Sequence, residues 1–114
     1  MKEIKAIVQP ARVARIREAM RRIDHFPGMT VSRAEGCSGT NVAPPQAGIR
    51  AELSDFSAKV RIEIVAPDEL VDAIVGAIIG ASSTGLRGDG LVWVTAVESM
   101  DRIQEGGVRK QRPG

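Results

Sequence analysis

Between a long apolar segment and a shorter one, the chain reads Thr84-Gly85-Leu86-Arg87-Gly88-Asp89-Gly90. The glycines in this stretch leave backbone amides that no side chain shields, and such amides suit the close approach of a phosphate or another anion. Gly-Asp-Gly also makes an ordinary turn. The stretch therefore predicts either an anion-binding loop or a plain connection, and its neighbours in the sequence decide between the two.

The segments beside this loop predict a helix before it and a strand after it. Residues 67–69, Pro-Asp-Glu, read as a helix start, because acidic side chains in a first turn complement the helix dipole. Residues 70–81 then carry an apolar stripe at helical spacing, with small residues that allow close packing on a sheet. Residues 91–97 are rich in strand-forming side chains.

The first part of the chain repeats this order of elements. Residues 2–9 alternate between two faces with the period of a strand. A helix is expected to begin at Pro10, and apolar residues recur at helical spacing as far as Ile23. Phe26-Pro27-Gly28 ends that helix, and residues 29–35 favour a second strand.

From residue 36 to residue 54 neither period is present, and a loop this long in a small domain is typically functional or disordered. Alternation resumes at residues 59–65, which predict a third strand. The strand positions expected to share a face toward the helices are Ile4, Ala6, Val8, Val60, Ile62 and Ile64.

This order of elements predicts an α+β fold, the ferredoxin-like βαββαβ sandwich, with a four-stranded antiparallel sheet and two helices on one face. The other face would carry Ile7 and Val65 among polar groups, so we expect another subunit to cover it. Residues 101–104 are expected to add one short ordered piece. The domain is placed at residues 1–103, with a long mobile loop at 37–55, and residues 104–114 are predicted to form a basic tail.

Composition excludes several classes of protein. A chain of 114 residues with 43% hydrophobic and 26% charged residues is an ordinary globular domain. Its longest mostly apolar run, residues 70–81, is too short to span a membrane, and charged residues interrupt the first ten positions, so a cytoplasmic location without membrane insertion is expected. The chain has one cysteine, one histidine and a net charge of +2, which argue against a cysteine metal cluster, a catalytic constellation and nucleic-acid binding.

Four separate pieces of the chain resemble the PII signal-transduction family, that of nitrogen regulatory protein P-II, in the family's order. The pieces are residues 1–10, Gly28-Met29-Thr30-Val31-Ser32, residues 59–65, and Thr84-Gly85 with Gly88-Asp89-Gly90. The resemblance implies a homotrimer of ferredoxin-like subunits that binds adenine nucleotides in the clefts between subunits. It further implies that the long loop docks on a target protein, such as a membrane transporter or a metabolic enzyme, and regulates it.

The resemblance also implies roles for particular residues. Gly88, Asp89 and Gly90 would hold phosphates through backbone amides, and Arg102 would reach a phosphate from the C-terminal segment. The residues expected to bind the nucleotide are Thr30, Glu63, Val65, Thr84, Arg87, Gly88, Asp89, Gly90 and Arg102. The residues expected to form the partner or effector loop are Gly39, Thr40, Asn41, Pro44, Pro45, Gly48, Arg50 and Lys59. No catalytic residue and no metal ligand is expected.

The chain departs from the family's pattern at the phosphate site. Leu91 stands where the family has a lysine, and Gln104 stands where it has a second arginine. Each charge-assisted contact contributes about 1.5–3 kcal/mol, although Arg87 can replace part of the loss. We therefore expect ADP or AMP to be favoured over ATP, with a small anionic metabolite as a further candidate ligand.

The long loop departs as well. The chain has no tyrosine, and Glu52 stands where the family's tyrosine receives a nucleotidyl group, so that form of covalent control is excluded. Gly39 and Thr40 replace the family's arginine and the glutamine that serves magnesium and 2-oxoglutarate. The resemblance is thus to a divergent PII-like member.

Two alternatives to a nucleotide sensor remain open at this stage. One is a trimeric scaffold that has lost nucleotide binding, because two phosphate-facing cations are absent. The other is an RNA-binding domain on the same fold, which would need aromatic side chains on the open sheet face to stack bases. Phe26 and Phe56 lie at element ends and Trp93 is the lone strand aromatic, which disfavours RNA.

Overall fold

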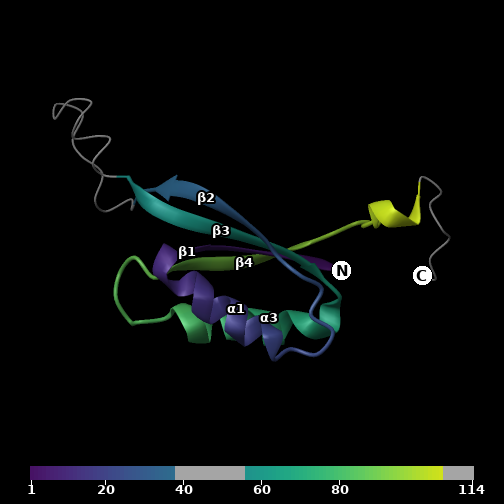
Figure 1. The fold of residues 1–114 in the computed structure, drawn as a ribbon, viewed down its shortest axis with the longest axis horizontal. Helices are drawn as coiled ribbons and strands as arrows, with labels where there is room; N and C mark the ends of the chain where they lie inside the picture. Colours follow the sequence, from purple (N-terminus) through teal and green to yellow (C-terminus); the bar gives the residue numbers. More distant parts are fainter. Residues whose placement is uncertain (38–55, 107–114) are drawn as a thin grey trace.

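The computed structural model of this chain describes residues 1–37 and 56–106. These residues form one antiparallel sheet with the strand order β2-β3-β1-β4, and two helices cover one of its faces (Figure 1). This arrangement confirms the predicted ferredoxin-like βαββαβ fold. The strands are β1 (Lys2–Val8), β2 (Thr30–Gly36), β3 (Ser57–Ala66) and β4 (Gly90–Ala96), and the helices are α1 (Val13–Arg21) and α3 (Val71–Ser82).

Both helices begin where the sequence predicts, but each begins as a single 3-10 turn. Pro10–Arg12 forms the turn before α1, and Asp68–Leu70 forms the turn before α3. Proline has a fixed φ and no amide to satisfy, so Pro10 can open the first turn without losing a hydrogen bond. Asp68 and Glu69 occupy the first turn before α3, where the positive end of the dipole favours them.

The core lies between the sheet and the helices. Every strand position predicted to face the helices on β1 and β3 is buried, and none is more than 8% exposed. Ile16 and Met20 of α1, and Ile74 and Ile78 of α3, supply the helical side of the same cluster. The spacing of four residues within each pair puts both side chains on one helix face, so two short helices cover the central strands β1 and β3.

The face of the sheet away from the helices, here called the open face, is partly apolar as predicted. Strand register places Thr30, Glu63, Lys5 and Trp93 in one row across it. The next row contains Ser32, Arg61, Ile7 and Leu91. Leu91 is 61% exposed and Trp93 is 37% exposed, because no helix lies over this side of β4.

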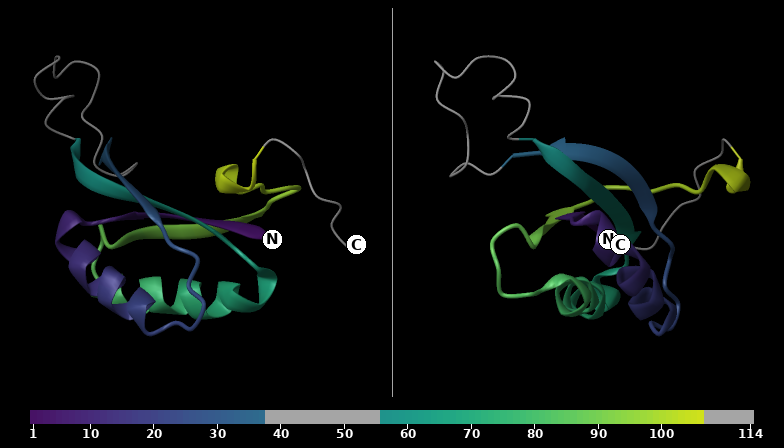
Figure 2. Two further views of the ribbon diagram at one scale, coloured as in Figure 1. Left: turned by 45° about the vertical axis from the view of Figure 1, so that its right-hand side comes forward. Right: turned by 60° about the vertical axis from the view of Figure 1, so that its left-hand side comes forward.

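The two ends of β1 lead to different parts of the molecule (Figure 2). The glycine loop, residues 84–90, lies at the Val8 end, where Gly90 pairs with Val8. The C-terminal arm, residues 97–106, leaves from the Lys2 end and extends away from the body of the domain (Figure 1). The short ordered piece expected in this arm is a 3-10 turn at Ile103–Glu105. Within residues 1–37 and 56–106, neither helix has the length and apolar character needed to span a bilayer.

Candidate functional site

The glycine loop is folded around the carboxylate of Asp89. The backbone amides of Thr84 and Gly85 donate to Asp89 Oδ2 over 2.7 and 3.0 Å, and the Thr84 hydroxyl donates to Oδ1. These bonds, that of the Thr84 hydroxyl first, lower the pKa of Asp89. The amide of Leu86 in turn donates to Thr84 Oγ1 over 3.2 Å. The amides of residues 84–86 are therefore occupied, so an anion would have to bind amides later in the loop.

Two glycines attach this loop to the end of β1. The Gln9 side-chain amide donates to the carbonyl of Gly88 over 2.6 Å. Gly90 has a φ of 108°, and a Cβ there would lie 1.9 Å from the carbonyl oxygen of Ile7. Only glycine fits so close to the neighbouring strand, so Gly90 is required by the packing here as well as leaving its backbone amide unshielded by a side chain.

A pocket of about 520 Å³ lies at the other end of the sheet, and we call it the open-face pocket. Four predicted nucleotide-binding residues come together in it, from β2, β3 and the C-terminal arm. Thr30 and Glu63 are direct partners across two strands, which explains their proximity. The pocket is lined by Thr30, Glu63, Val65, Arg102, Glu3, Pro27, Gly28, Met29 and Met100.

The open-face pocket holds more hydrogen-bond acceptors than cations. Glu3 and Glu63 contribute two carboxylates, and Arg102 contributes the guanidinium. Lys5 Nζ lies 3.7 Å from Glu3 Oε1 and offsets part of the negative charge. Carboxylates repel phosphate and accept hydrogen bonds from N–H and O–H groups, so the pocket suits the amine and hydroxyl groups of a ligand better than its phosphates.

The structure therefore divides the predicted nucleotide-binding residues into two groups that do not meet in one chain. Thr84, Arg87, Gly88, Asp89 and Gly90 belong to the glycine loop, whereas Thr30, Glu63, Val65 and Arg102 belong to the open-face pocket. Glu3 lines the pocket and Ile7 contacts Gly90. These two residues of β1 are about 14 Å apart at the rise of a β-strand.

Most of the predicted partner loop lies outside the described residues. Gly39, Thr40, Asn41, Pro44, Pro45, Gly48 and Arg50 lie outside the described residues. Lys59 lies on β3 opposite Ala34, near the end of the β2–β3 pair. It lines a broad hollow of about 690 Å³ together with Arg33, Glu35 and Pro10.

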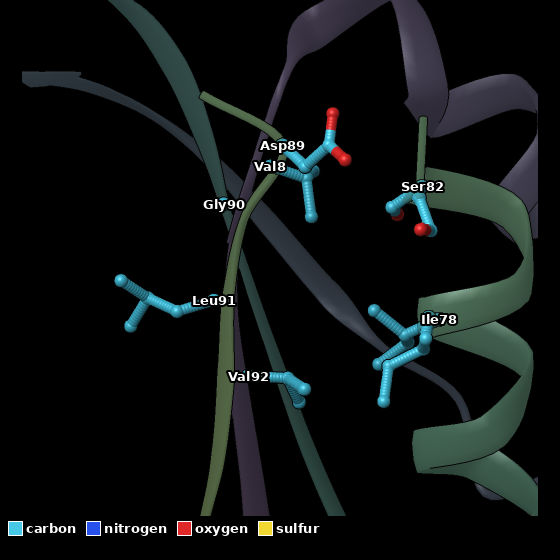
Figure 3. Close-up of a pocket in the computed structure, with 9 residues that line it drawn as sticks. Val8, Ile78, Ser82, Asp89, Gly90, Leu91 and Val92 are labelled. Atoms are coloured by element: carbon cyan, nitrogen blue, oxygen red, sulfur yellow. The ribbon is translucent and has the colours of Figure 1, made fainter. Parts of the chain in front are cut away.

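A smaller pocket lies between α3 and β4, beside the glycine loop, and we call it the α3–β4 slot. Its volume is about 170 Å³, and it is lined by Val8, Ile78, Ile79, Ser82, Ser83, Asp89, Gly90, Leu91 and Val92. Ile78 and Val92 point toward each other across the slot, while Leu91 points away on the other side of β4 (Figure 3). Ser82 is 6% exposed, and its hydroxyl has no hydrogen-bond partner among the described residues.

Several pocket residues were missed from the sequence. Two of them could have been found from the sequence: Glu3 shares the open face of β1 with Lys5 and Ile7, at every second position, and Met29 directly precedes the predicted Thr30. Met100 and the bond from Gln9 to Gly88 could not be found in this way, since both depend on where segments distant in sequence meet. In the part of the chain that the structure describes, no group of three or more His, Cys, Asp and Glu side chains is placed to hold a metal ion.

Comparison with known proteins assigns the chain to a family. The family model described as "Nitrogen regulatory protein P-II" matches residues 1–107. Nitrogen regulatory protein P-II 1 of Escherichia coli is 39% identical over 107 residues, which are 93% of this chain and 94% of that protein. Nitrogen regulatory protein P-II of Haemophilus influenzae is 38% identical, and that of Rhizobium meliloti 36% identical, with the same coverage of both chains. The chain therefore belongs to the nitrogen regulatory protein P-II family.

Proposed function

We propose that this P-II family signalling protein binds an adenine nucleotide between two copies of its chain and regulates a partner protein according to the bound nucleotide. The observation that carries the proposal is the separation of the two groups of candidate ligand residues at opposite ends of β1. A single protomer cannot bring them to one ligand. Two protomers packed head to tail can do so, and a repeated head-to-tail contact closes a ring when the rotation between neighbours brings the last protomer back to the first.

The open-face pocket is suited to the adenosine part of such a ligand. Glu63 and Glu3 can accept hydrogen bonds from an exocyclic amine or from ribose hydroxyls, and Thr30 can donate or accept. Val65 and Met29 supply apolar surface for the flat base. Arg102 carries the positive charge of this pocket and would direct the phosphates toward the neighbouring protomer.

The glycine loop of the neighbouring protomer would then receive the phosphates. Its backbone is already held by Asp89 and Gln9, so binding would require little further ordering. Arg87 is exposed on the same loop and adds a cation. Leu91, exposed on the open face of β4, offers no charge to a third phosphate. We therefore propose a preference for AMP or ADP over ATP with magnesium, with room for a small anion beside a shorter nucleotide.

The proposed output is control of a partner protein through residues 37–55. The relatives are named nitrogen regulatory proteins, and we extend a role in nitrogen regulation to this chain. The partner would be a transporter or a metabolic enzyme, and the chain itself would act as a regulator without catalysing a reaction.

Isothermal titration calorimetry with AMP, ADP and magnesium ATP tests the ligand, and light scattering on a size-exclusion column tests for the homotrimer. We expect AMP or ADP to bind at least tenfold more tightly than magnesium ATP. Arg102→Ala should weaken binding about tenfold to a hundredfold, since a charged hydrogen bond contributes about 1.5–3 kcal/mol. Arg15→Ala, an exposed change on α1, serves as the matched control.

Two other results would each contradict part of the proposal. Tight binding of magnesium ATP with negligible AMP and ADP affinity would overturn the preference. A trimer that binds none of the three nucleotides would instead identify the chain as a scaffold that has lost its ligand.

A further inference from the structure

The C-terminal arm presents an isoleucine to solvent on an ordered turn. Ile103 is 95% exposed, the largest exposed fraction among the large hydrophobic side chains that the structure describes. It opens the 3-10 turn Ile103–Glu105, which extends away from the body of its own domain (Figure 1). Burial of this side chain by another molecule would be favourable, because it removes apolar surface from water.

The α3–β4 slot has the shape and chemistry that such a side chain requires. Ile78, Val8 and Val92 make its walls apolar (Figure 3). Its volume of about 170 Å³ is similar to that of an apolar cavity of ~150 Å³ that accommodates benzene, so a four-carbon side chain fits. Ser82 adds a buried hydroxyl without a hydrogen-bond partner among the described residues, which the main chain of an entering segment can satisfy.

The position of the slot connects these two features. Asp89 and Gly90 belong both to the glycine loop and to the lining of the slot. In the proposed assembly, Arg102 of one protomer faces the glycine loop of the next. Ile103 follows Arg102 in the chain, with adjacent Cα atoms ~3.8 Å apart, so it arrives beside the slot of that next protomer.

We propose that Ile103 of one protomer inserts into the α3–β4 slot of the neighbouring protomer. The inference rests on the head-to-tail assembly of the proposed function. It adds to that assembly an apolar contact, the insertion of Ile103 into the slot, which is separate from the nucleotide contacts and is here called the lock. This contact is not made within the protomer, because the arm leaves from the Lys2 end of β1 and extends away from the domain, whereas the slot lies at the Val8 end (Figure 1). Because Arg102 and Ile103 are adjacent, a nucleotide phosphate that holds Arg102 also holds the lock in place.

Disulfide cross-linking tests the contact without reference to nucleotide. Ile79 lines the slot and is 51% exposed, so a cysteine there is accessible. The variant Cys37→Ser, Ile103→Cys, Ile79→Cys removes the single native thiol and places one new thiol on each side of the proposed contact. A disulfide needs Cα atoms about 4.4–6.8 Å apart. The control variant carries Cys37→Ser and Ile103→Cys with Arg15→Cys, an exposed position on α1.

Under mild oxidation, we expect the slot pair to form at least tenfold more covalent oligomer than the control pair on a non-reducing gel. Cross-linking no greater than in the control overturns the inference. A second variant, Ile103→Ser, keeps an exposed position exposed and should leave the protomer folded. It should raise the concentration at which the assembly dissociates by at least tenfold, and an unchanged dissociation concentration counts against the lock.

The two proposals fail separately. Specific cross-linking in a protein that binds no adenine nucleotide would support the lock and refute the nucleotide site. Nucleotide binding in an assembly whose slot pair cross-links no better than the control would support the site and refute the lock.

Discussion

Gly90 and Gly85 both have positive φ, but a methyl group would meet very different surroundings at the two positions. At Gly90, φ is 108° and a Cβ would collide with the carbonyl of Ile7 at 1.9 Å. At Gly85, φ is 78° and nothing lies within 4 Å of the added atom. Gly85→Ala should therefore lower the free energy of unfolding by about 1–2 kcal/mol through backbone strain alone. Gly90→Ala should lower it by at least about 3 kcal/mol, because strain and displacement of β1 add together.

Chemical denaturation of the two glycine variants measures this difference. Equal losses of stability would show that the glycine loop shifts away from β1 without cost, and that Gly90 is not required by the packing.

Asp89 makes the loop sensitive to acid. The bonds from the Thr84 hydroxyl and amide hold the pKa of this carboxyl below its ordinary value. Since the folded pKa lies below the unfolded one, the stabilisation is present above the unfolded pKa of about 3.9 and is lost as the pH falls through the folded value. Asp89→Asn keeps a neutral acceptor at every pH. The melting temperatures of wild type and variant should differ most near neutral pH and converge as the pH falls below about 3.9 and through the folded pKa of Asp89.

Asp68 titrates in the same acidic range and must be accounted for. The hydrogen bond from the N-terminal ammonium, and then its charge, lower the pKa of Asp68. This group is present in both wild type and Asp89→Asn, so its effect cancels in the difference between their melting curves. A difference in melting temperature that stays constant from neutral pH to about pH 3 would rule out the proposed role of the Asp89 charge.

The sheet and the helices pack against each other through one face of each element. Ile62 of β3 and Val31 of β2 are partners across the two strands, yet Ile62 is fully buried and Val31 is 43% exposed. Ile62→Ala should lower the free energy of unfolding by about 2–5 kcal/mol, because it leaves a cavity under the helices. Val31→Ala, the matched control, should cost less than about 1 kcal/mol.

Denaturant titration of both strand variants provides the measurement. Similar losses for the partners would indicate that β2 contributes to the core as much as β3, contrary to the burial along the two strands.

The helices and strands could be predicted because their sequence periods are simple, but the contacts between them could not. Alternation in β1 and β3 identified the buried face correctly, and Pro10 identified the start of the first helical segment. Element bounds shifted by a few residues: β4 begins at Gly90, because that glycine already pairs with Val8. The bonds of Asp89 depend on how the loop turns back on itself, and no period in the sequence encodes that turn.

In the whole molecule the candidate site is divided into two halves, the open-face pocket and the glycine loop. Mixing two variants, each defective in one half, tests whether the halves serve one ligand across an interface. Arg102→Ala impairs the open-face pocket, and Arg87→Glu places a repulsive charge on the glycine loop. In a randomly mixed trimer population, head-to-tail pairing gives about a quarter of the sites an intact pocket and an intact loop from different protomers. We expect nucleotide binding by calorimetry to recover to about that level after the variants are unfolded and refolded together.

Each variant refolded alone is the control and should stay defective. If the mixture binds no more nucleotide than the average of the two separate variants, the pocket and the loop do not serve one ligand across an interface.

Trp93 is the only tryptophan in the chain and lies on the open face, in the same row as Lys5 and Glu63. Indole emission shifts to shorter wavelength when water is removed from around the ring, so this side chain makes the protein its own optical probe. Ultraviolet excitation of the unlabelled protein, followed during dilution, would reveal in real time whether a neighbour covers this face.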